Sequence, residues 1–210
     1  MAQLNDVVRF ALTGACKGRE LYASAFQLDA VLGRIVLTAS EPLLAQVRIA
    51  WWRDQFRDPE VGCQAKDPLV QSLRTAWGED AVFLVPLIDG WESLLSEEET
   101  GSHFVEGRSQ LAGAIACMLD CNRQRATAEA LASLWAFSDL AHYFGKSEIR
   151  DWALTNWEES ASNFRRSSIA LRPLVVLGGL AKRALEKGGV PMLGDRMSPF
   201  VGFRLWAIGV

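Results

Sequence analysis

The stretch SEPLLAQVRIAWWRDQFRD, residues 40–58, decides how the fold of this chain is read. Ser40 is a good helix N-cap, Pro42 suits the first helical turn, and no further proline or glycine follows before Pro59. By the usual rise per residue, the stretch makes a helix of about five turns. It therefore predicts one long helix that starts at residue 40.

The side chains of this helix divide between two faces. One expected face carries Leu43, Val47, Ala50, Trp51 and Asp54, and another carries Arg48, Trp52 and Gln55. Because Trp51 and Trp52 are adjacent, they point in different directions, and an exposed one would mark an interaction surface.

Helical spacing of apolar residues recurs along the rest of the chain. It predicts further helices over residues 3–13, 19–38, 67–77, 81–96, 102–121, 127–144, 148–168, 174–186 and 200–210. No segment has the period-two alternation of a strand, and no repeat of fixed period occurs. The sequence thus predicts an all-α fold, a single-domain up-and-down helical bundle over residues 1–210.

Composition excludes several classes of function. The 210 residues are 50% hydrophobic and 22% charged, with a formal charge of -3 and a pI near 5.5, which argues against nucleic-acid binding. The N-terminus lacks the pattern of a secretory signal, and no apolar run reaches the roughly 20 residues of a membrane span. Four cysteines fit a reducing compartment. We expect a cytoplasmic protein, with peripheral association at the inner membrane surface as the alternative.

Several stretches resemble one enzyme family. Residues 21–56, LYASAFQLDAVLGRIVLTASEPLLAQVRIAWWRDQF, look like the start of the squalene/phytoene synthase family, in whose bacterial and mitochondrial branch an Arg-x-x-Trp-Trp-Arg helix follows a Ser-Glu-Pro turn. Residues 67–92 are similar to the next helix pair of that branch, with its Ile-Asp-Gly element. Residues 111–116 resemble a small-residue helix centre where the isoprenoid passes, and residues 156–186 resemble a late helix pair.

The resemblance implies the isoprenoid synthase type of helical bundle, here shortened. It also implies the reaction of that family, which starts from an allylic diphosphate. Ionising an allylic diphosphate leaves a carbocation and pyrophosphate, so active members of the family need a magnesium cluster to neutralise the leaving group. Magnesium takes oxygen ligands, which two Asp-rich motifs on facing helices supply. A dry, apolar pocket protects the cation from water.

The expected Asp-rich motifs are missing from this chain. The first would fall at residues 36–40, which contain no carboxylate, and the second would fall late in residues 127–144, where Asp139 stands alone. Gly107 replaces a tyrosine that family members often carry, and a segment after residue 144 is shorter than in active members. The resemblance therefore predicts a scaffold that has lost most of its magnesium ligands.

Relocated acids are the alternative. Asp54 and Asp58 have the one-turn spacing of a metal site, and Glu92 or Asp29 could complete it. The competing interpretation of Asp54 and Asp58 is a solvated helix end.

Four further residues are candidates for a pocket or a diphosphate site. Arg48 and Arg53 could contact a diphosphate or pair with acids, although surface or intrahelical pairing is the commoner role of such residues. Asp29 and Asp139 are either buried hydrogen-bonding groups or exposed side chains. No residue is assigned a catalytic role.

Two functions follow. The first is a catalytically degenerate family member that acts as an isoprenoid-binding or assembly and interaction module, without a cofactor; the mitochondrial branch that this chain resembles is associated with respiratory complex I assembly. The second is an active head-to-head prenyltransferase that condenses isoprenyl diphosphates with relocated, Mg²⁺-binding acids. We favour the first because of the missing aspartates.

Overall fold

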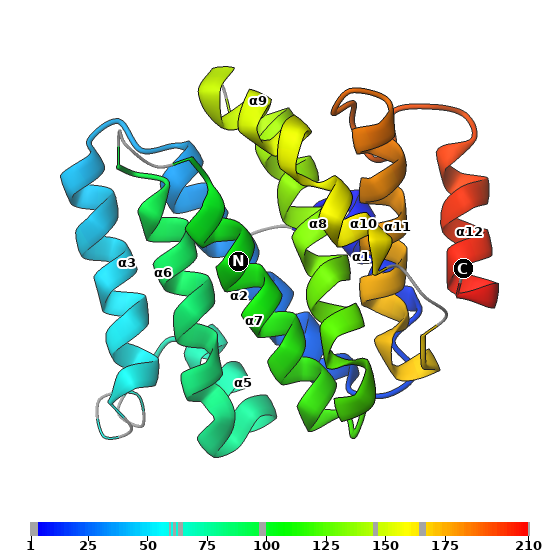
Figure 1. Cartoon of the computed structure of the whole chain (residues 1–210). Coiled ribbons are helices and arrows are strands. Elements are labelled where there is room, and N and C mark those ends of the chain that lie inside the picture. The colour runs from blue at the N-terminus through cyan, green and yellow to red at the C-terminus, as the bar shows by residue number, and fades with distance from the viewer. Residues whose placement is uncertain are drawn as a thin grey trace.

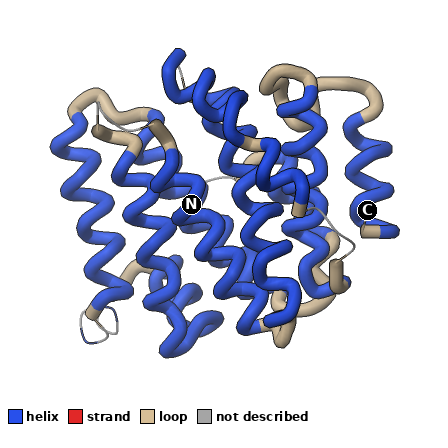
Figure 2. The backbone as a smooth tube through the Cα atoms, viewed as in Figure 1, coloured by secondary structure: helices blue, strands red, loops and turns tan. Residues whose placement is uncertain are grey.

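The computed structural model describes residues 4–58, 60, 62, 65–96, 100–144, 147–163 and 167–209. These residues form helices and connecting loops, and no strand occurs among them (Figure 2). The prediction of an all-α fold is confirmed.

The α-helices have the following bounds: α1 Asp6–Thr13, α2 Arg19–Leu37, α3 Pro42–Arg57, α5 Pro68–Trp77, α6 Val85–Ser93, α7 Ser102–Met118, α8 Arg125–Tyr143, α9 Ser147–Asn156, α10 Glu158–Ser162, α11 Arg172–Glu186 and α12 Ser198–Ile208. Among the described residues, three 3₁₀ helices join them: η1 Gly78–Leu84, η2 Asn122–Gln124 and η3 Ile169–Leu171.

The middle of the bundle is formed by α7, α8 and α11, which lie side by side, while α3 and α12 lie at opposite edges (Figure 1). The most extensive helix contacts are those of α8 with α7 and with α11. Buried apolar side chains form one connected core that reaches from Val7 of α1 to Leu205 of α12. None of the described helices is long and apolar enough to cross a membrane.

The face of α3 that carries Leu43 and Val47 is the solvent face. Leu43 is 69% exposed and Val47 is 63% exposed. The buried stripe instead comprises Ala45, Ile49, Trp52, Gln55 and Phe56. This stripe has equally good helical spacing, and packing against the neighbouring helices selects it. Trp51 is the outward tryptophan, and its role in an interaction surface stays a prediction.

The start of α3 also corrects a prediction. Ser40 is not the N-cap; that position belongs to Glu41, whose side chain makes no capping hydrogen bond. Pro42 fixes the first turn instead, since its ring sets a helical φ and it lacks the N–H that a cap would satisfy.

Other boundaries follow local signals. Asp67 caps α5 as predicted, accepting hydrogen bonds from the N–H groups of Leu69 and Val70, and Gly78 ends the helix. The predicted helix over residues 81–96 is divided into η1 and α6, because Pro86 occupies the first turn of a new helix.

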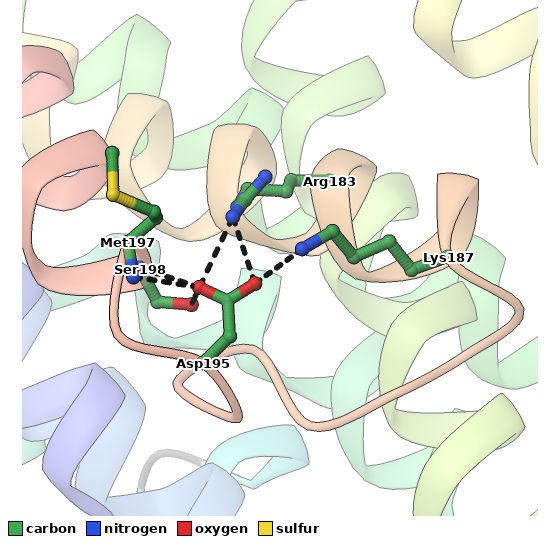
Figure 3. Close-up of polar contacts among 5 residues, drawn as sticks. All are labelled: Arg183, Lys187, Asp195, Met197 and Ser198. Carbon is green, nitrogen blue, oxygen red and sulfur yellow. Dashed lines mark hydrogen bonds and ion pairs between the residues drawn. The ribbon is translucent and has the colours of Figure 1, made fainter.

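An acidic side chain fastens the link between α11 and α12 (Figure 3). Asp195 accepts hydrogen bonds from Arg183 at 2.7 and 3.0 Å, from Lys187, and from the N–H groups of Met197 and Ser198 at 2.9 and 2.8 Å. The bonds from Lys187 and Arg183 lower the pKa of Asp195 far below its usual range. Asp195 thereby joins the end of α11 to the start of α12.

Candidate functional site

Two of the predicted site residues, Asp29 of α2 and Asp139 of α8, are brought together by Arg108 of α7. Arg108 Nε lies 3.0 Å from Asp29 Oδ1 and Nη2 lies 2.8 Å from Asp29 Oδ2, so this pair is bidentate. Arg108 Nη1 lies 2.6 Å from Asp139 Oδ2. All three side chains are buried, with 2% of Arg108, 6% of Asp29 and 7% of Asp139 exposed. We call these residues the Arg108 triad.

Close packing of α6 against α7 positions the triad. A Cβ on Gly90 would lie 2.9 Å from the carbonyl oxygen of His103, and one on Gly107 would collide with the carbonyl oxygen of Pro86. The two glycines therefore let the helix backbones approach. The residues that follow them both contact Asp29: Trp91 Nε1 donates to Asp29 Oδ1 at 2.9 Å, and Arg108 forms the bidentate pair.

Aromatic rings surround the guanidinium. Arg108 Cζ lies 3.8 Å from the ring centroid of Trp135, 4.5 Å from that of Phe104 and 5.5 Å from that of Trp91. A cation over an aromatic face is attracted by the negative charge density of the ring, and most strongly by that of tryptophan. The rings and the two carboxylates together compensate the cost of burying the charge.

Burial and ion pairing shift the pKa values of Arg108 and Asp139 in opposite directions. Burial disfavours the charged form of Arg108, but Asp29 and Asp139 outweigh that effect and raise its pKa, so the guanidinium stays protonated. Burial raises the pKa of Asp139, and Arg108 only partly opposes the shift. The ion pair with Arg108 thus compensates the burial of the Asp139 carboxylate only in part.

A cavity of about 240 Å³ opens beside the triad, and we call it the Arg108 cavity. Its charged lining residues are Asp29, Arg34, Arg108 and Asp139. Its aromatic walls are Phe26, Trp91, Trp135, Tyr143 and Phe144. A concave, mostly apolar site with a few converging polar groups is the usual form of a small-molecule site. Asp139 and Tyr143 also line a neighbouring cavity of about 260 Å³.

The two candidate arginines of α3 lie away from this cavity. Arg53 pairs with two acids of α6, at 2.5 Å from Asp89 Oδ1 and also with Glu92, and these partners raise its pKa against the opposing effect of burial. Arg48 is exposed and lines a separate surface cavity of about 340 Å³ together with Trp52. Within the described part of the chain, neither arginine forms a hydrogen bond or ion pair with Asp29 or Asp139, so their diphosphate role stays a prediction.

Asp54 and Asp58 are exposed at the end of α3. Asp58 Oδ1 accepts a hydrogen bond from the Glu60 N–H at 2.8 Å, and Glu92 is engaged by Arg53. Within the described ranges no group of three or more His, Cys, Asp or Glu side chains is placed to hold a metal ion. Because Asp29 and Asp139 are bonded to Arg108, the residues present do not fit the facing oxygen-ligand set of a magnesium cluster.

The sequence interpretation missed Arg108, although a signal for it exists. Phe104, Arg108, Leu111 and Ile115 follow one another at spacings of four, three and four residues, and all four are buried. A lone arginine on the apolar face of a helix needs buried acids as partners. The small-residue stretch over residues 111–116 lies on the same helix, and there Gly113 packs against Arg125 and Glu129 of α8.

Comparisons with known proteins place this chain in no family. No protein-family model matches it, no curated protein is significantly similar to it, and no solved structure matches its fold significantly.

Proposed function

We propose that this chain is a catalytically inactive, squalene/phytoene synthase-like bundle that binds one short isoprenoid in the Arg108 cavity. It does not condense prenyl diphosphates. The proposal keeps the all-helical scaffold and the apolar pocket of that family and gives up its metal-dependent chemistry.

The observation that carries the proposal is the bonding of Arg108 to both Asp29 and Asp139. These are the buried acids of α2 and α8, and the guanidinium already neutralises them through three hydrogen bonds. Binding a divalent cation there would require breaking these bonds in a site where buried charges are costly to leave unpaired. The acids are therefore committed to holding the bundle together.

The size of the cavity supports a short ligand. By proportion to the roughly 150 Å³ cavity that binds the six carbons of benzene, a volume of about 240 Å³ accommodates about ten non-hydrogen atoms. That is the size of one or two isoprene units. A farnesyl chain is larger, and head-to-head condensation needs space for two such chains.

Two assays test the proposal. Purified protein incubated with farnesyl diphosphate or geranylgeranyl diphosphate and Mg²⁺ should yield no condensed hydrocarbon by gas chromatography. Calorimetric titration with a short isoprenoid such as geraniol should show saturable binding. Condensed product that disappears on addition of a chelator would overturn the proposal in favour of the active prenyltransferase.

A matched pair of variants ties the binding to the cavity. Ala30 lines the Arg108 cavity, whereas Ala50 is a half-buried residue of α3 that lies outside its lining. Ala30→Leu should reduce the cavity and abolish binding, and Ala50→Leu should leave the affinity unchanged. Equal affinities for the two variants would place the ligand elsewhere.

A further inference from the structure

The outer face of α3 is apolar although it meets solvent. Leu43, Leu44, Val47 and Trp51 are all exposed. They recur at helical spacing on the side away from the buried stripe of this helix, and we call them the α3 patch. Asp54 follows Trp51 by three positions, so it adds one exposed acid to the end of the patch. The solvent face of α3 thus combines an apolar area with a negative charge.

The outer face of α12 is also apolar, and its charges have the opposite sign. Phe200 is 70% exposed, Phe203 is 61% exposed, and Ile208 is exposed at the end of the helix. We call these three residues the α12 patch. Arg204 lies one turn from Phe200 and one turn from Ile208, so it belongs to the same face, and Arg196 precedes Phe200 by four residues. Both arginines are exposed. This face thus combines an apolar area with positive charge.

The two patches lie far apart on the molecule, because α3 and α12 are at opposite edges of the bundle (Figure 1). One copy therefore cannot cover its α3 patch with its own α12 patch. In the part of the chain that the structure describes, the side chains of Asp54, Arg196 and Arg204 form no hydrogen bond or ion pair, so their charges are available to a partner. Contiguous exposed apolar patches of this kind mark interaction sites.

A second copy of the chain is the occupant that fits both patches at once. Pairing two α12 patches would bring the arginines of one copy toward those of the other, and pairing two α3 patches would do the same with Asp54. Like charges brought together across an interface are unfavourable. Pairing an α3 patch with an α12 patch instead brings Asp54 toward Arg196 and Arg204. It also joins Trp51 to phenylalanine side chains, and aromatic residues and arginine are enriched in interfaces.

We propose that the α3 patch of one copy binds the α12 patch of the next copy. Two different surfaces meet in this contact, so the interface is heterologous, and association either closes into a ring or continues as a filament. The interface lies apart from the Arg108 cavity. Isoprenoid binding therefore neither supports nor refutes the inference, and failure of one proposal leaves the other in place.

Sedimentation velocity of the native protein over a range of concentrations gives the first test. The average mass should rise above the monomer mass of 23.2 kDa as the concentration increases. Native protein that stays monomeric at every concentration would overturn the inference. If this monomer also sedimented with phosphatidylglycerol vesicles, the α12 patch would be a lipid-binding surface instead.

Two double variants test which surfaces meet. Leu43→Gln with Val47→Gln removes most of the α3 patch, and Phe200→Gln with Phe203→Gln removes most of the α12 patch. Each variant alone should form at most weak complexes, because one half of every contact is lost. An equimolar mixture should form a dimer of one copy of each and nothing larger, because only one intact pair of patches remains. Association that is lost in one variant and kept in the other would show pairing of like patches and overturn the inference.

A third double variant is the matched control for these substitutions. Val82 and Phe83 are exposed apolar residues of η1 that lie outside both patches. Val82→Gln with Phe83→Gln should leave the association unchanged, and circular dichroism should show that all three double variants keep the native helix content. Equal weakening by the control would mean that the association is unspecific, which would overturn the inference.

A charge reversal tests the contribution of the acid. Asp54→Arg would bring a positive charge toward Arg196 and Arg204 of the next copy, so it should weaken the association several-fold. Asp151 is an exposed acid of α9, and Asp151→Arg makes the same change in net charge away from both patches. It should leave the association unchanged. Equal effects of the two reversals would refute the pairing of the α3 patch with the α12 patch.

Discussion

Trp51 and Trp52 meet edge to face with their ring centroids 5.0 Å apart, yet Trp51 is 43% exposed and Trp52 only 7%. The pair therefore marks the boundary between the solvent face and the core face of α3, and the two residues should respond very differently to the same substitution.

Trp52→Ala should lower the free energy of unfolding by about 3–5 kcal/mol, as is usual when a large buried aromatic side chain is removed. Trp51→Ala should cost about 0.5–1.5 kcal/mol, the size of an aromatic pair contact. Urea unfolding followed by circular dichroism measures both. Ile49→Ala and Val47→Ala give the aliphatic comparison, with the large loss expected at Ile49. A larger loss at Val47 would mean that α3 presents the other face to the core.

Removing Arg108 should be among the most destabilising changes in the chain. Arg108→Met leaves the carboxylates of Asp29 and Asp139 buried without their counter-ion, which typically costs about 3–5 kcal/mol. Denaturant unfolding at neutral pH gives the value.

A triple variant separates the pairing from the packing at this position. Replacing the whole triad, with Asp29→Leu and Asp139→Leu added to Arg108→Met, should recover much of the lost stability, because no charge is then left unpaired. A triple variant that is less stable than Arg108→Met alone would contradict this account.

Because Gly107 lies against the backbone of Pro86, we expect any side chain at position 107 to destabilise the protein. Gly107→Ala places a methyl group against a backbone carbonyl that cannot move independently, so α6 and α7 must separate. We expect a loss of about 1–3 kcal/mol in the free energy of unfolding, the usual cost of overpacking. Gln110→Ala, at an exposed position on the same helix, should stay within about 0.5 kcal/mol of the native protein.

Asp195 should make the stability of the link between α11 and α12 depend on pH in the acid range. Its folded-state pKa lies below the ordinary value of 3.8, so its contribution to stability is present above that value and is lost as the pH falls through the folded-state pKa. At neutral pH the Tm of Asp195→Asn should therefore be lower than that of the native protein. The difference should shrink between about pH 5 and pH 3.

Asp6→Asn, at an exposed side chain in the first turn of α1, serves as the control for this titration. Its Tm difference from the native protein should be small at every pH. A Tm difference for Asp195→Asn that stays constant with pH would show that the ion pairs in Figure 3 do not stabilise the link between α11 and α12.

The sequence predicted the elements that carry local signals. Asp67, Pro68 and Gly78 define α5 through a side-chain cap, a fixed φ and a residue that tolerates positive φ, and each of these acts within a few residues. The division of residues 81–96 also has a local cause in Pro86, which the sequence interpretation overlooked. The all-α fold follows from such signals together with the helical period.

Features that depend on distant parts of the chain could not be predicted. On α3, the stripe of Leu43 and Val47 and the stripe of Ile49 and Trp52 have equally good spacing, and only the position of α6 and the other neighbours decides which one is buried. Asp29 and Asp139 were identified as candidates, but their common partner is 79 residues from one and 31 from the other. Pairing over such separations is decided by tertiary packing.

Within the Arg108 triad, the buried acids obtain their counter-charge from the chain itself. A counter-ion attached to the backbone is present at fixed stoichiometry, and neither dilution nor a chelator can withdraw it. Proteins whose acidic centres are neutralised by dissolved cations gain stability only at sufficient cation concentration. In the folded chain the guanidinium of Arg108 provides the same neutralisation without any dissolved cation.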